Sequence, residues 1–472
     1  MDILQEERKT VSMQKPLQNL SAFPIASFWE INPEERAAIL MQAIIDTHKW
    51  HFPRNNSYRR TVEARGIEAE IAVSDLARLL RPTSQVFKSY IDLLGTPFPQ
   101  DKTEAFIDWL ADQVSLHLPV ERAKKLHSRY PSMEAILQAV EALYADYGFE
   151  FSTSSGTSGR ASIMLRDKTS MDRTVESFYL SYKRYFGMQV DHRAVFVMPA
   201  QTRIAMARMV NFSVKRIGIP SERTHFTIPF PAYPDQVRIR SGRVFKGGWR
   251  GQIERHILYP LMNRINDRFI TPQAVKKTIE ILRKSQETGE KVLLFSGWIQ
   301  LHRIAQEIIS IGKPITLPPG SLMGTGGGFK EFYEYTPEQI HHDLKLAVRT
   351  IENKPVPVRD VYGMAESNWA AMQCDQGNYH IPPWVFSVTL DDNDALQQGS
   401  DQTGLLAFFD PYGGGQLFPA FFKTADRTRL INGSLGYDPA LNCLCGDQTA
   451  YMAKGSITRV DLIDEAGCAA QV

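Results

Sequence analysis

The sequence predicts an α/β fold, with a βαβ core between a helical N-terminal region and a small β subdomain. Strand-like and helix-like patterns alternate through the middle of the chain, which is typical of helices packed on a mainly parallel sheet. The pattern predicts a buried strand over residues 195–198 and further strands over 291–295 and 357–362, and helical patterns cover residues 203–216, 299–311 and 337–352. A chain of 472 residues has room for about two or three domains, so we divide it into 1–148, 149–383 and 384–472.

Local signals assign the two flanking regions. Asn32 is a helix-capping residue, Pro33 suits the first helical position and Glu35 can complete a capping box, so a helix begins here. Further helical patterns cover residues 103–116 and 131–146. These patterns make the first region mainly helical. In the last region the pattern changes to short strands separated by glycine-rich turns, which predicts a small β subdomain.

Composition and charge exclude several classes of protein. A 43% apolar content and a net charge of +2 describe a soluble globular chain, not a disordered or nucleic-acid-coating one. The N-terminus lacks the pattern of a signal peptide, and no run of about 18 uncharged apolar residues predicts a membrane span. Four cysteines are too few for a disulfide framework in a chain of this size. We therefore expect a cytoplasmic protein.

A hydroxyl-rich glycine loop, from Thr153 to Arg160, is the most informative motif. It places two glycines and five hydroxyl side chains between apolar residues. Glycines bring backbone N–H groups close to a ligand, and rotatable hydroxyls and an arginine add donors for phosphate. The spacing of the glycines differs from that of a Walker loop. The loop therefore favours a polyphosphate ligand, and a flexible serine–glycine linker is the structural alternative.

Three later segments fit the same kind of site. Residues 323–330 hold a glycine run against which a flat purine could lie. Residues 358–367 predict a strand followed by a turn, with the carboxylate of Glu366 just beyond the strand end, where α/β sheets bind ligands and where Mg²⁺ could be held. Residues 422–427 carry Asp426, a carboxylate able to accept hydrogen bonds from both ribose hydroxyls. Any one of these segments, taken alone, is more simply explained by a structural role than by ligand binding.

Together these motifs resemble the signatures of the adenylate-forming superfamily. Residues 154–162 are similar to its phosphate signature, with Ala161-Ser162 in place of Pro-Lys. Residues 362–366 are similar to its Tyr-Gly-x-Thr-Glu signature, with Ala365 in place of Thr. Residues 424–426 are similar to its Thr-Gly-Asp signature, with Ala425 in place of Gly. The resemblance implies that ATP activates a carboxylate, giving an acyl-adenylate and pyrophosphate.

The resemblance also assigns roles to individual residues. Glu366 would hold Mg²⁺, Asp426 would bind ribose, and Glu366 and Thr157 would act in catalysis. The residues expected to bind phosphate are Ser154, Ser155, Gly156, Thr157, Ser158 and Gly159. The residues expected around the adenine are Gly326, Gly327, Gly328, Tyr362 and Gly363. The charge of the missing family lysine would come from elsewhere, such as Arg160.

A narrower resemblance is to the LuxE-type acyl-protein synthetases. It depends on Phe87-Lys88-Ser89-Tyr90, on the Gly-Gly-Gly-Phe-Lys run at 326–330 and on a chain that ends before the usual lysine-bearing C-terminal domain. It implies adenylation of a fatty acid and transfer of the acyl group to a protein cysteine, for which Cys468 is the candidate. An acyl reductase is then an expected partner.

Two alternatives stay open. Residues 442–461 are similar to a region of the phenylacetate–CoA ligases, so coenzyme A or a carrier protein could be the acyl acceptor. The altered signatures are also compatible with a nucleotide-binding protein that lacks catalysis. No feature favours nucleic acid as a partner.

A second group of residues could bind a metal ion: Cys374, His380, Cys443 and Cys445. Three thiolates and one imidazole can complete a closed, structural zinc site. Unrelated buried cysteines are the alternative, and a similar grouping in the phenylacetate–CoA ligases favours Zn²⁺.

Elsewhere, the basic stretch 238–255 predicts a solvated loop or, alternatively, a surface for an anion or a carrier protein.

Overall fold

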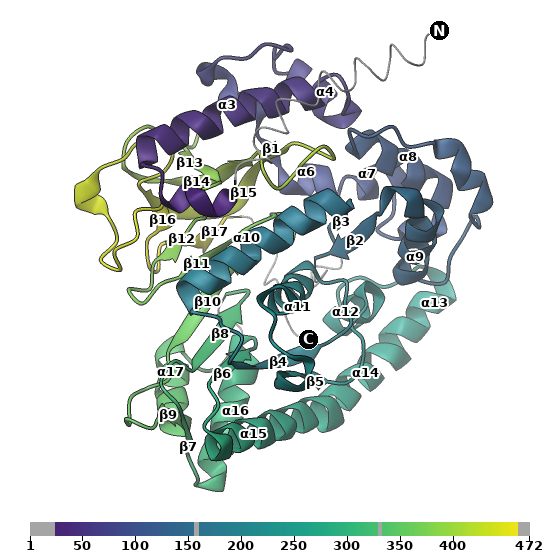
Figure 1. The fold of residues 1–472 in the computed structure, drawn as a ribbon. Coiled ribbons are helices and arrows are strands. Elements are labelled where there is room, and N and C mark those ends of the chain that lie inside the picture. Colours follow the sequence, from purple (N-terminus) through teal and green to yellow (C-terminus); the bar gives the residue numbers. More distant parts are fainter. Residues whose placement is uncertain (1–23, 155–159, 329–332, 461–472) are drawn as a thin grey trace.

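The computed structural model describes residues 24–154, 160–328 and 333–460. Its main feature is one long hydrogen-bonded sheet of 13 strands, with helices packed against it (Figure 1). Along the sheet the order is β13-β14-β15-β16-β12-β11-β10-β8-β6-β4-β5, and β1 and β17 pair with β15. The mixed α/β fold expected from the sequence is confirmed. Within the described residues, no helix combines the length and the apolar character that a bilayer-crossing segment requires.

The N-terminal region is mainly helical. Asn32 caps its first long helix by accepting a hydrogen bond from the backbone N–H of Glu35 at 2.9 Å, as the sequence predicted. The helices are η1 (Ile25–Trp29), α3 (Pro33–His51), α4 (Asn56–Glu63), η2 (Val73–Asp75), α5 (Leu76–Leu79), α6 (Thr83–Phe87), α7 (Tyr90–Leu94), η3 (Pro99–Asp101), α8 (Thr103–Gln113), η4 (Val120–Lys125), α9 (Met133–Leu143) and η5 (Ala145–Tyr147). The short strand β1 (Arg81–Pro82) joins this region to β15.

The core alternates strands and helices. Strands β4, β5, β6, β8 and β10 run parallel, so their carboxyl ends meet at one edge of the sheet. The strands are β2 (Glu150–Thr153), β3 (Ile163–Arg166), β4 (Arg193–Pro199), β5 (Thr224–Ile228), β6 (Val292–Phe295), β7 (Ile315–Leu317), β8 (Leu322–Gly326), β9 (Val348–Thr350) and β10 (Val358–Gly363). The helices are α10 (Lys168–Phe186), α11 (Ala205–Ile217), η6 (Ser221–Arg223), α12 (Pro234–Ser241), α16 (Trp298–Ile311) and α17 (Pro337–Ala347).

A long helical run begins shortly after α12. The sequence predicted a solvated loop over 238–255, but helices cover both ends of that range and only residues 242–247 form a loop, so the prediction is wrong for the rest. The run consists of α13 (Gly248–Ile253), η7 (Glu254–Leu258), α14 (Tyr259–Ile265), η8 (Asn266–Ile270) and α15 (Thr271–Thr288). Its glycines and prolines hid the helical pattern, because both residue types usually end helices. Gly251 is required by packing, since a Cβ there would lie 1.7 Å from the Lys246 carbonyl oxygen.

Most of the C-terminal strands are short, as expected, but β14 and β15 are longer. The C-terminal strands are β11 (Ala370–Gln373), β12 (Tyr379–His380), β13 (Phe386–Leu390), β14 (Asp401–Asp410), β15 (Ala420–Ile431), β16 (Tyr451–Met452) and β17 (Thr458–Arg459), with η9 (Pro439–Leu441) between them. β14 has 10 residues and β15 has 12, because each pairs with the other along most of its length. These strands continue the same sheet as β10. The domain boundaries at 148 and 383 stay predictions.

Candidate nucleotide site and cysteine–histidine cluster

The predicted nucleotide motifs lie on four elements that converge at one edge of the sheet. The hydroxyl-rich loop joins β2 and β3, which pair as an antiparallel hairpin. The glycine run begins within β8 and continues past its end, and Glu366 lies in the turn between β10 and β11. Asp426 lies on β15. The carboxyl ends of β8 and β10 are adjacent because these two strands pair in parallel. This is the edge where open α/β sheets bind ligands.

Ser154 and Ser162 fasten the base of the hydroxyl-rich loop. The Ser154 backbone N–H donates to the Ser162 carbonyl at 3.1 Å, and the Ser154 Oγ accepts from the Ser162 N–H at 2.8 Å. The loop therefore leaves and re-enters the hairpin at a fixed separation. The predicted phosphate ligands between these ends, Ser155, Gly156, Thr157, Ser158 and Gly159, lie outside the described residues.

The contact between Ser162 and Glu366 joins the loop to the strand end. The Ser162 hydroxyl is fully buried and donates a hydrogen bond to the Glu366 Oε1, across 204 residues of sequence. Ser162 occupies the place where the superfamily signature has lysine. A buried hydroxyl cannot supply that positive charge, but it orients the carboxylate.

Arg166 holds the turn that carries Glu366, and sequence reasoning missed it. Arg166 lies at the end of β3 and is almost completely buried. Its Nε donates to Asn368 Oδ1 at 3.2 Å and its Nη2 donates to the Ser367 carbonyl at 3.3 Å. The Nη1 atom has no hydrogen-bond partner among the described residues. Burial lowers the pKa of Arg166 to about 10, so the guanidinium stays charged near neutral pH.

Arg166 therefore brings a buried positive charge into the electrostatic neighbourhood of Glu366. Its position after an apolar run was visible in the sequence, but its burial depends on the pairing of β2 with β3 and could not be read from the run alone. Arg160, which the sequence suggested for this charge, is exposed.

Tyr362 and Asp426 meet across the sheet. The Tyr362 hydroxyl donates to Asp426 Oδ2 at 2.7 Å, although the two residues are 64 positions apart. Desolvation raises the pKa of Tyr362 well above its usual value, and the negative charge of Asp426 raises it further. The hydroxyl therefore stays protonated and remains a donor. The backbone N–H of Asp426 donates to Thr424 Oγ1 at 3.0 Å, which fixes the acid within its motif.

The glycine run is partly a strand, not only a loop as predicted. Gly324 and Gly326 lie in β8, and a Cβ at Gly324 would come within 2.3 Å of the Phe295 ring, so Gly324 has a packing role. Gly327 and Gly328 have left-handed φ angles of 80° and 65° and turn the chain out of the strand. Gly363 also has a packing reason, because a Cβ there would lie 2.9 Å from Met206.

Two buried hydroxyls without hydrogen-bond partners among the described residues lie at this edge of the sheet. The Thr325 Oγ1 atom, near the end of β8, has no hydrogen-bond partner among the described residues. Ser296, just after β6, has the same property, and its N–H donates to the Gly324 carbonyl at 3.1 Å. Buried polar atoms are normally satisfied, so the carboxyl ends of β6 and β8 fit a polar ligand.

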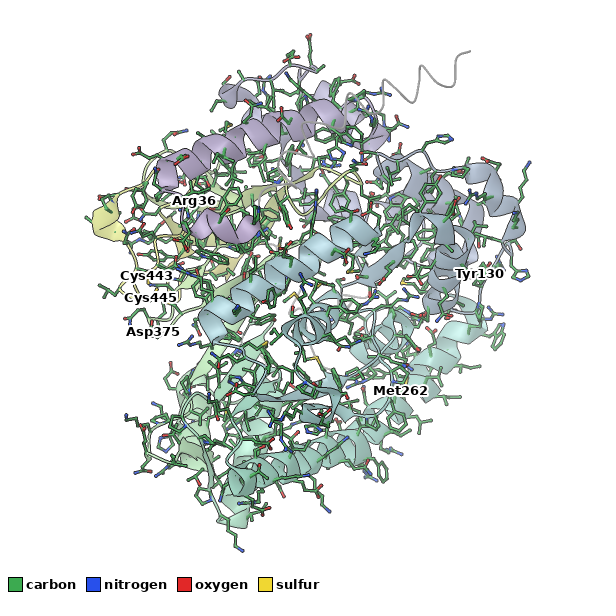
Figure 2. All side chains as sticks on the ribbon, viewed as in Figure 1. Arg36, Tyr130, Met262, Asp375, Cys443 and Cys445 are labelled. Carbon is green, nitrogen blue, oxygen red and sulfur yellow. The ribbon has the colours of Figure 1, made fainter. Side chains whose placement is uncertain are left out.

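The four residues of the second group come together, as the sequence predicted for a metal site. Cys374 follows β11, His380 lies on β12, and Cys443 and Cys445 precede β16 (Figure 2 labels the last two). One donor atom from each residue lies within 4.8 Å of all the others. Cys374, Cys443 and His380 are buried, and Cys445 is half-buried.

The spacing of the donors fits a tetrahedral zinc site. A centre with Zn–S distances of about 2.3 Å has edges of about 3.8 Å between sulfurs. The Sγ atoms of Cys374 and Cys443 lie 3.8 Å apart, too far for a disulfide, and the Sγ of Cys445 lies 3.3 Å from His380 Nε2. His380 Nδ1 contacts Thr449 Oγ1 at 2.9 Å, which leaves Nε2 for a metal.

The one cysteine outside this cluster, Cys468, lies outside the described residues.

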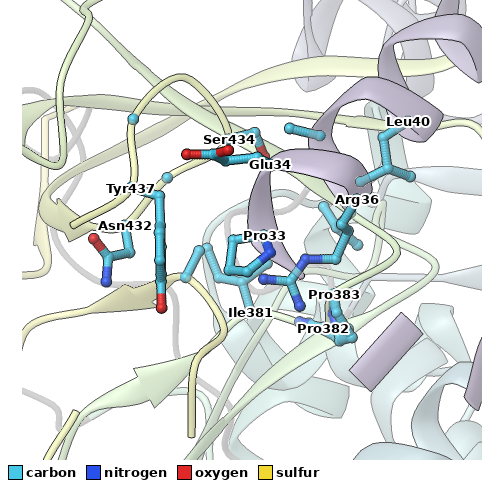
Figure 3. A pocket seen from close by; sticks show the side chains of 15 residues that line it. Pro33, Glu34, Arg36, Leu40, Ile381, Pro382, Pro383, Asn432, Ser434 and Tyr437 are labelled. Atoms are coloured by element: carbon cyan, nitrogen blue, oxygen red, sulfur yellow. The ribbon is translucent and has the colours of Figure 1, made fainter. Parts of the chain in front are cut away.

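A cavity of about 250 Å³ is visible near the start of α3, between Glu34 and Arg36 on one side and Asn432 and Tyr437 on the other (Figure 3). Arg36 Nη2 donates to the Gln448 carbonyl at 3.2 Å, so the lining is tied to the chain beside the cysteine–histidine cluster. Among the described residues, none of the predicted nucleotide ligands lines this cavity.

Comparisons of the sequence support the resemblance drawn from the motifs. Residues 261–471 match the family model described as acyl-protein synthetase, LuxE. A long-chain-fatty-acid–luciferin-component ligase of Vibrio harveyi is 22% identical over 274 residues. That alignment covers 58% of this chain and 61% of the relative, which is less than two thirds of the relative's length. The chain thus resembles the LuxE-type enzymes, as the sequence predicted.

Comparisons of the structure confirm the fold. Two structures of a 2-hydroxyisobutyryl-CoA ligase, both in complex with 2-HIB-AMP and CoA, are similar to it. The open conformation gives a TM-score of 0.53 at 11% identity and covers 90% of this chain and 70% of the ligase. The thioesterification state gives 0.55 at 12% identity, with 90% and 68% covered. The chain has the fold of adenylate-forming ligases.

Proposed function

We propose that this protein activates a carboxylic acid with ATP, forming an acyl-adenylate and releasing pyrophosphate. The observation that carries the proposal is the contact of Ser162 with Glu366, which joins the phosphate motif to the proposed metal-binding carboxylate. The contact of Tyr362 with Asp426 adds the proposed ribose ligand to the same edge of the sheet. The sequence match to LuxE acyl-protein synthetases and the fold of adenylate-forming ligases support the same reaction.

In the proposed reaction the substrate carboxylate oxygen attacks the α-phosphorus of ATP. The new O–P bond forms as the bond to the pyrophosphate oxygen breaks, and pyrophosphate takes the electron pair. Backbone N–H groups and hydroxyls of the loop after Ser154 would bind the phosphates. Bound at Glu366, Mg²⁺ would neutralise charge on the phosphate oxygens. Holding two anions in line supplies several kcal/mol of the acceleration in comparable reactions.

The chain's own residues prepare this step in three ways. Ser162 orients Glu366, and Arg166 fixes the turn that carries it. Tyr362 holds Asp426 in position to accept hydrogen bonds from the ribose hydroxyls. Gly327 and Gly328 turn the chain beside the expected adenine position.

The acyl acceptor is the second part of the proposal. We favour a fatty acid as substrate and a protein thiol as acceptor, with Cys468 as the candidate. The thiolate would attack the carbonyl carbon of the acyl-adenylate, forming a C–S bond while AMP leaves with the C–O electron pair. The acyl group could then pass to an acyl reductase. Coenzyme A or a carrier protein is the alternative acceptor, favoured by the CoA-ligase fold.

We place this activity in the cytoplasm, where ATP is available and cysteines stay reduced. We also propose that Cys374, His380, Cys443 and Cys445 bind one structural Zn²⁺, supported by their donor spacing and burial. The metal would join the hairpin after β11 to the segment before β16.

Pyrophosphate exchange tests the central proposal. Labelled pyrophosphate returns to ATP only when adenylation is reversible and an acid is present, so a panel of fatty and aromatic acids separates an enzyme from a nucleotide-binding protein without catalysis. Absence of acid-dependent exchange in folded protein that binds ATP would favour the binding protein.

The acceptor is tested separately with labelled fatty acid and ATP, followed by peptide mass analysis. A hydroxylamine-sensitive acyl group on Cys468, lost in Cys468→Ala, supports a protein-acylating ligase. Fast acyl transfer to coenzyme A by Cys468→Ala, with no label on the parent protein, would assign the chain to the CoA ligases instead.

A further inference from the structure

The helical segment from α13 to η8 lies at the outer edge of the molecule (Figure 1). A stripe of exposed apolar side chains runs along it. Its six members are Trp249, Ile253, Ile257, Leu261, Ile265 and Phe269, each between 37% and 70% exposed. We call these residues the apolar stripe. Elsewhere in the described chain, exposed large apolar side chains do not repeat at a four-residue spacing. Scattered residues of that kind need no explanation, but a continuous row does.

The helix is built so that residues four apart stay in line. In an α-helix with about 3.6 residues per turn, a four-residue repeat drifts around the axis. Here two π-helical turns interrupt the α-helix, shown by the N–H of Tyr259 bonding to the Glu254 carbonyl and the N–H of Thr271 bonding to the Asn266 carbonyl. The wider turns reverse the drift, so the stripe keeps to one side.

Two prolines explain the wider turns. Pro260 and Pro272 each follow the last residue bonded in a π turn. Proline lacks an N–H and its ring clashes with the carbonyl four residues before it, and a wider turn relieves that clash. The sequence therefore specifies the two π turns, and the π turns align the stripe.

The inner side of the same helix is fastened to the protein. The carboxylate of Glu254 is buried and accepts two hydrogen bonds from Arg238, at 2.8 and 2.7 Å. Gly251 lets the helix lie directly on the Lys246 carbonyl, and the ring of Tyr259 packs edge-on against Phe245. Met262, half-buried, also lies on this helix (Figure 2). The stripe is thus held on an anchored helix and faces outward.

Cations accompany the apolar stripe. Arg250, Arg255, Arg264 and Arg268 are all exposed on the same helix, as is His256. Of the two acids in this segment, Glu254 is buried against Arg238, so Asp267 is the exposed one. The Arg250 guanidinium lies over the Trp249 ring of the stripe, whereas that of Arg255 lies over Phe245 on the inner side. The exposed part of this helix therefore combines aromatic and aliphatic side chains with an excess of positive charge.

This charge pattern disfavours a second copy of the chain as the occupant. An antiparallel pair of stripes centred near Tyr259 would place Arg250 of each copy near Arg268 of the other. A parallel pair would place each arginine near its own copy. Like charges at such positions destabilise helix pairs, and one exposed acid per chain cannot compensate for them.

We propose that the apolar stripe binds the surface of an anionic lipid bilayer. Interfacial helices combine a row of Trp, Phe, Leu and Ile with Arg on the neighbouring face, lie in the plane of the membrane and are attracted by anionic headgroups. Trp249 and Phe269 lie at the two ends of the stripe, and aromatic rings favour the headgroup region. The surface is separate from the nucleotide site, so the proposal stands whether or not the chain activates an acid.

Vesicle sedimentation of the full-length protein tests the proposal. Vesicles of phosphatidylglycerol and phosphatidylcholine should bind the protein, and vesicles of phosphatidylcholine alone should bind it much more weakly. The stripe variant Ile257→Gln/Leu261→Gln/Phe269→Gln and the charge variant Arg264→Glu/Arg268→Glu should each lower the partition coefficient by about tenfold or more. Added salt should weaken binding to the anionic vesicles.

Matched controls separate this surface from general hydrophobicity and charge. Ile309→Gln/Ile311→Gln/Leu346→Gln removes exposed apolar residues from α16 and α17. Lys276→Glu/Lys284→Glu makes the same charge change on α15. Both controls should stay within about twofold of the parent protein, and circular dichroism should show the same helix content for all variants.

Three results would overturn the proposal. One is no binding of the parent protein to the anionic vesicles. Another is a dimer that the stripe variant dissociates, without vesicle binding, which would assign the stripe to a second copy. The third is binding to soluble polyglutamate that depends on the stripe, again without vesicle binding, which would assign it to an acidic protein.

Discussion

The two candidate sites lie at opposite ends of one short strand and are built in different ways. Glu366 precedes β11 and Cys374 follows it. At the first end, single hydrogen bonds join side chains from β10, β15 and the β2–β3 hairpin. At the other end, four donor atoms lie within 4.8 Å of one another. The first arrangement leaves groups able to bind a substrate, whereas a metal held by all four donors of the second would have no open position.

The cysteine–histidine end of β11 is built for stability, and the carboxylate end is built for chemistry. A closed set of buried ligands supplies folding free energy when it binds a metal. Hydrogen-bonded carboxylates at a strand end supply charge and orientation to a bound substrate. Substitutions at the two ends of β11 should therefore separate thermal stability from catalytic rate.

Removing a zinc ligand should have the largest effect. Cys443→Ser should abolish stoichiometric zinc and lower the free energy of unfolding by about 3 kcal/mol or more, because metal binding and folding are coupled. Elemental analysis and thermal unfolding of protein purified without chelator measure both quantities. The Cys468→Ser variant removes the one cysteine outside the cluster and should keep its zinc. A parent protein without zinc would contradict the metal proposal.

Glu366→Gln should have the largest effect on catalysis. Loss of one negative charge from the proposed Mg²⁺ ligand should raise the barrier to adenylation by about 3 kcal/mol, a rate loss on the order of a hundredfold. Glutamine keeps the shape of the side chain, so thermal unfolding should change little. Acid-dependent pyrophosphate exchange is the measurement.

Asp375→Asn is the matched control for Glu366→Gln. It removes an exposed carboxylate beside the other end of β11 and should leave exchange unchanged (Figure 2). If Glu366→Gln retained near-normal exchange, Glu366 would not be the metal-binding acid.

Much of the fold could be predicted from the sequence, because the relevant patterns are local. The strands at 195–198 and 291–295 and the capped helix at Asn32 need only apolar runs and capping residues to be recognised. The run α13–α15 could not be predicted this way, since its stability comes from packing that makes Gly251 necessary. The length of β14 and β15 depends on their pairing, which is also a long-range property.

The candidate site likewise has a part that local motifs predict and a part that depends on long-range contacts. Motif spacing suggested Tyr362, Glu366 and Asp426 as site residues, and the spacing of the cysteines suggested the second cluster. The partners of these residues were not predictable: the contact of Ser162 with Glu366 spans 204 positions, and that of Tyr362 with Asp426 spans 64. Which side chain turns toward which depends on the order of strands in the sheet.

Ser162→Ala should have an intermediate effect on catalysis. It removes the hydroxyl that orients Glu366, and a hydrogen bond to a charged group contributes about 1.5–3 kcal/mol. Part of this loss should appear in the rate, so exchange should fall about tenfold, less than for Glu366→Gln. A double-mutant cycle with Glu366→Gln measures the coupling. Additive losses would show that Ser162 does not act through Glu366.

Tyr362→Phe should give the smallest effect, and a second tyrosine–aspartate pair provides its control. The Tyr362 hydroxyl donates to Asp426 at 2.7 Å, and the Tyr379 hydroxyl donates to Asp360 at 2.8 Å near the cysteine–histidine cluster. Loss of the first bond leaves Asp426 less well positioned for ribose, so the KM for ATP should rise about threefold to tenfold while kcat changes little.

The pH dependence of this effect follows from the pKa of Tyr362. Desolvation and the Asp426 carboxylate raise that pKa well above its usual value, so the hydroxyl stays protonated and the ratio of parent to variant KM should be constant from about pH 6 to 9. Tyr379→Phe should instead lower thermal stability and leave the KM for ATP unchanged, since Tyr379 lies on β12 beside His380 of the cluster. Equal KM changes in both variants would mean that the two ends of β11 are not separable, and the division between chemistry and stability would fail.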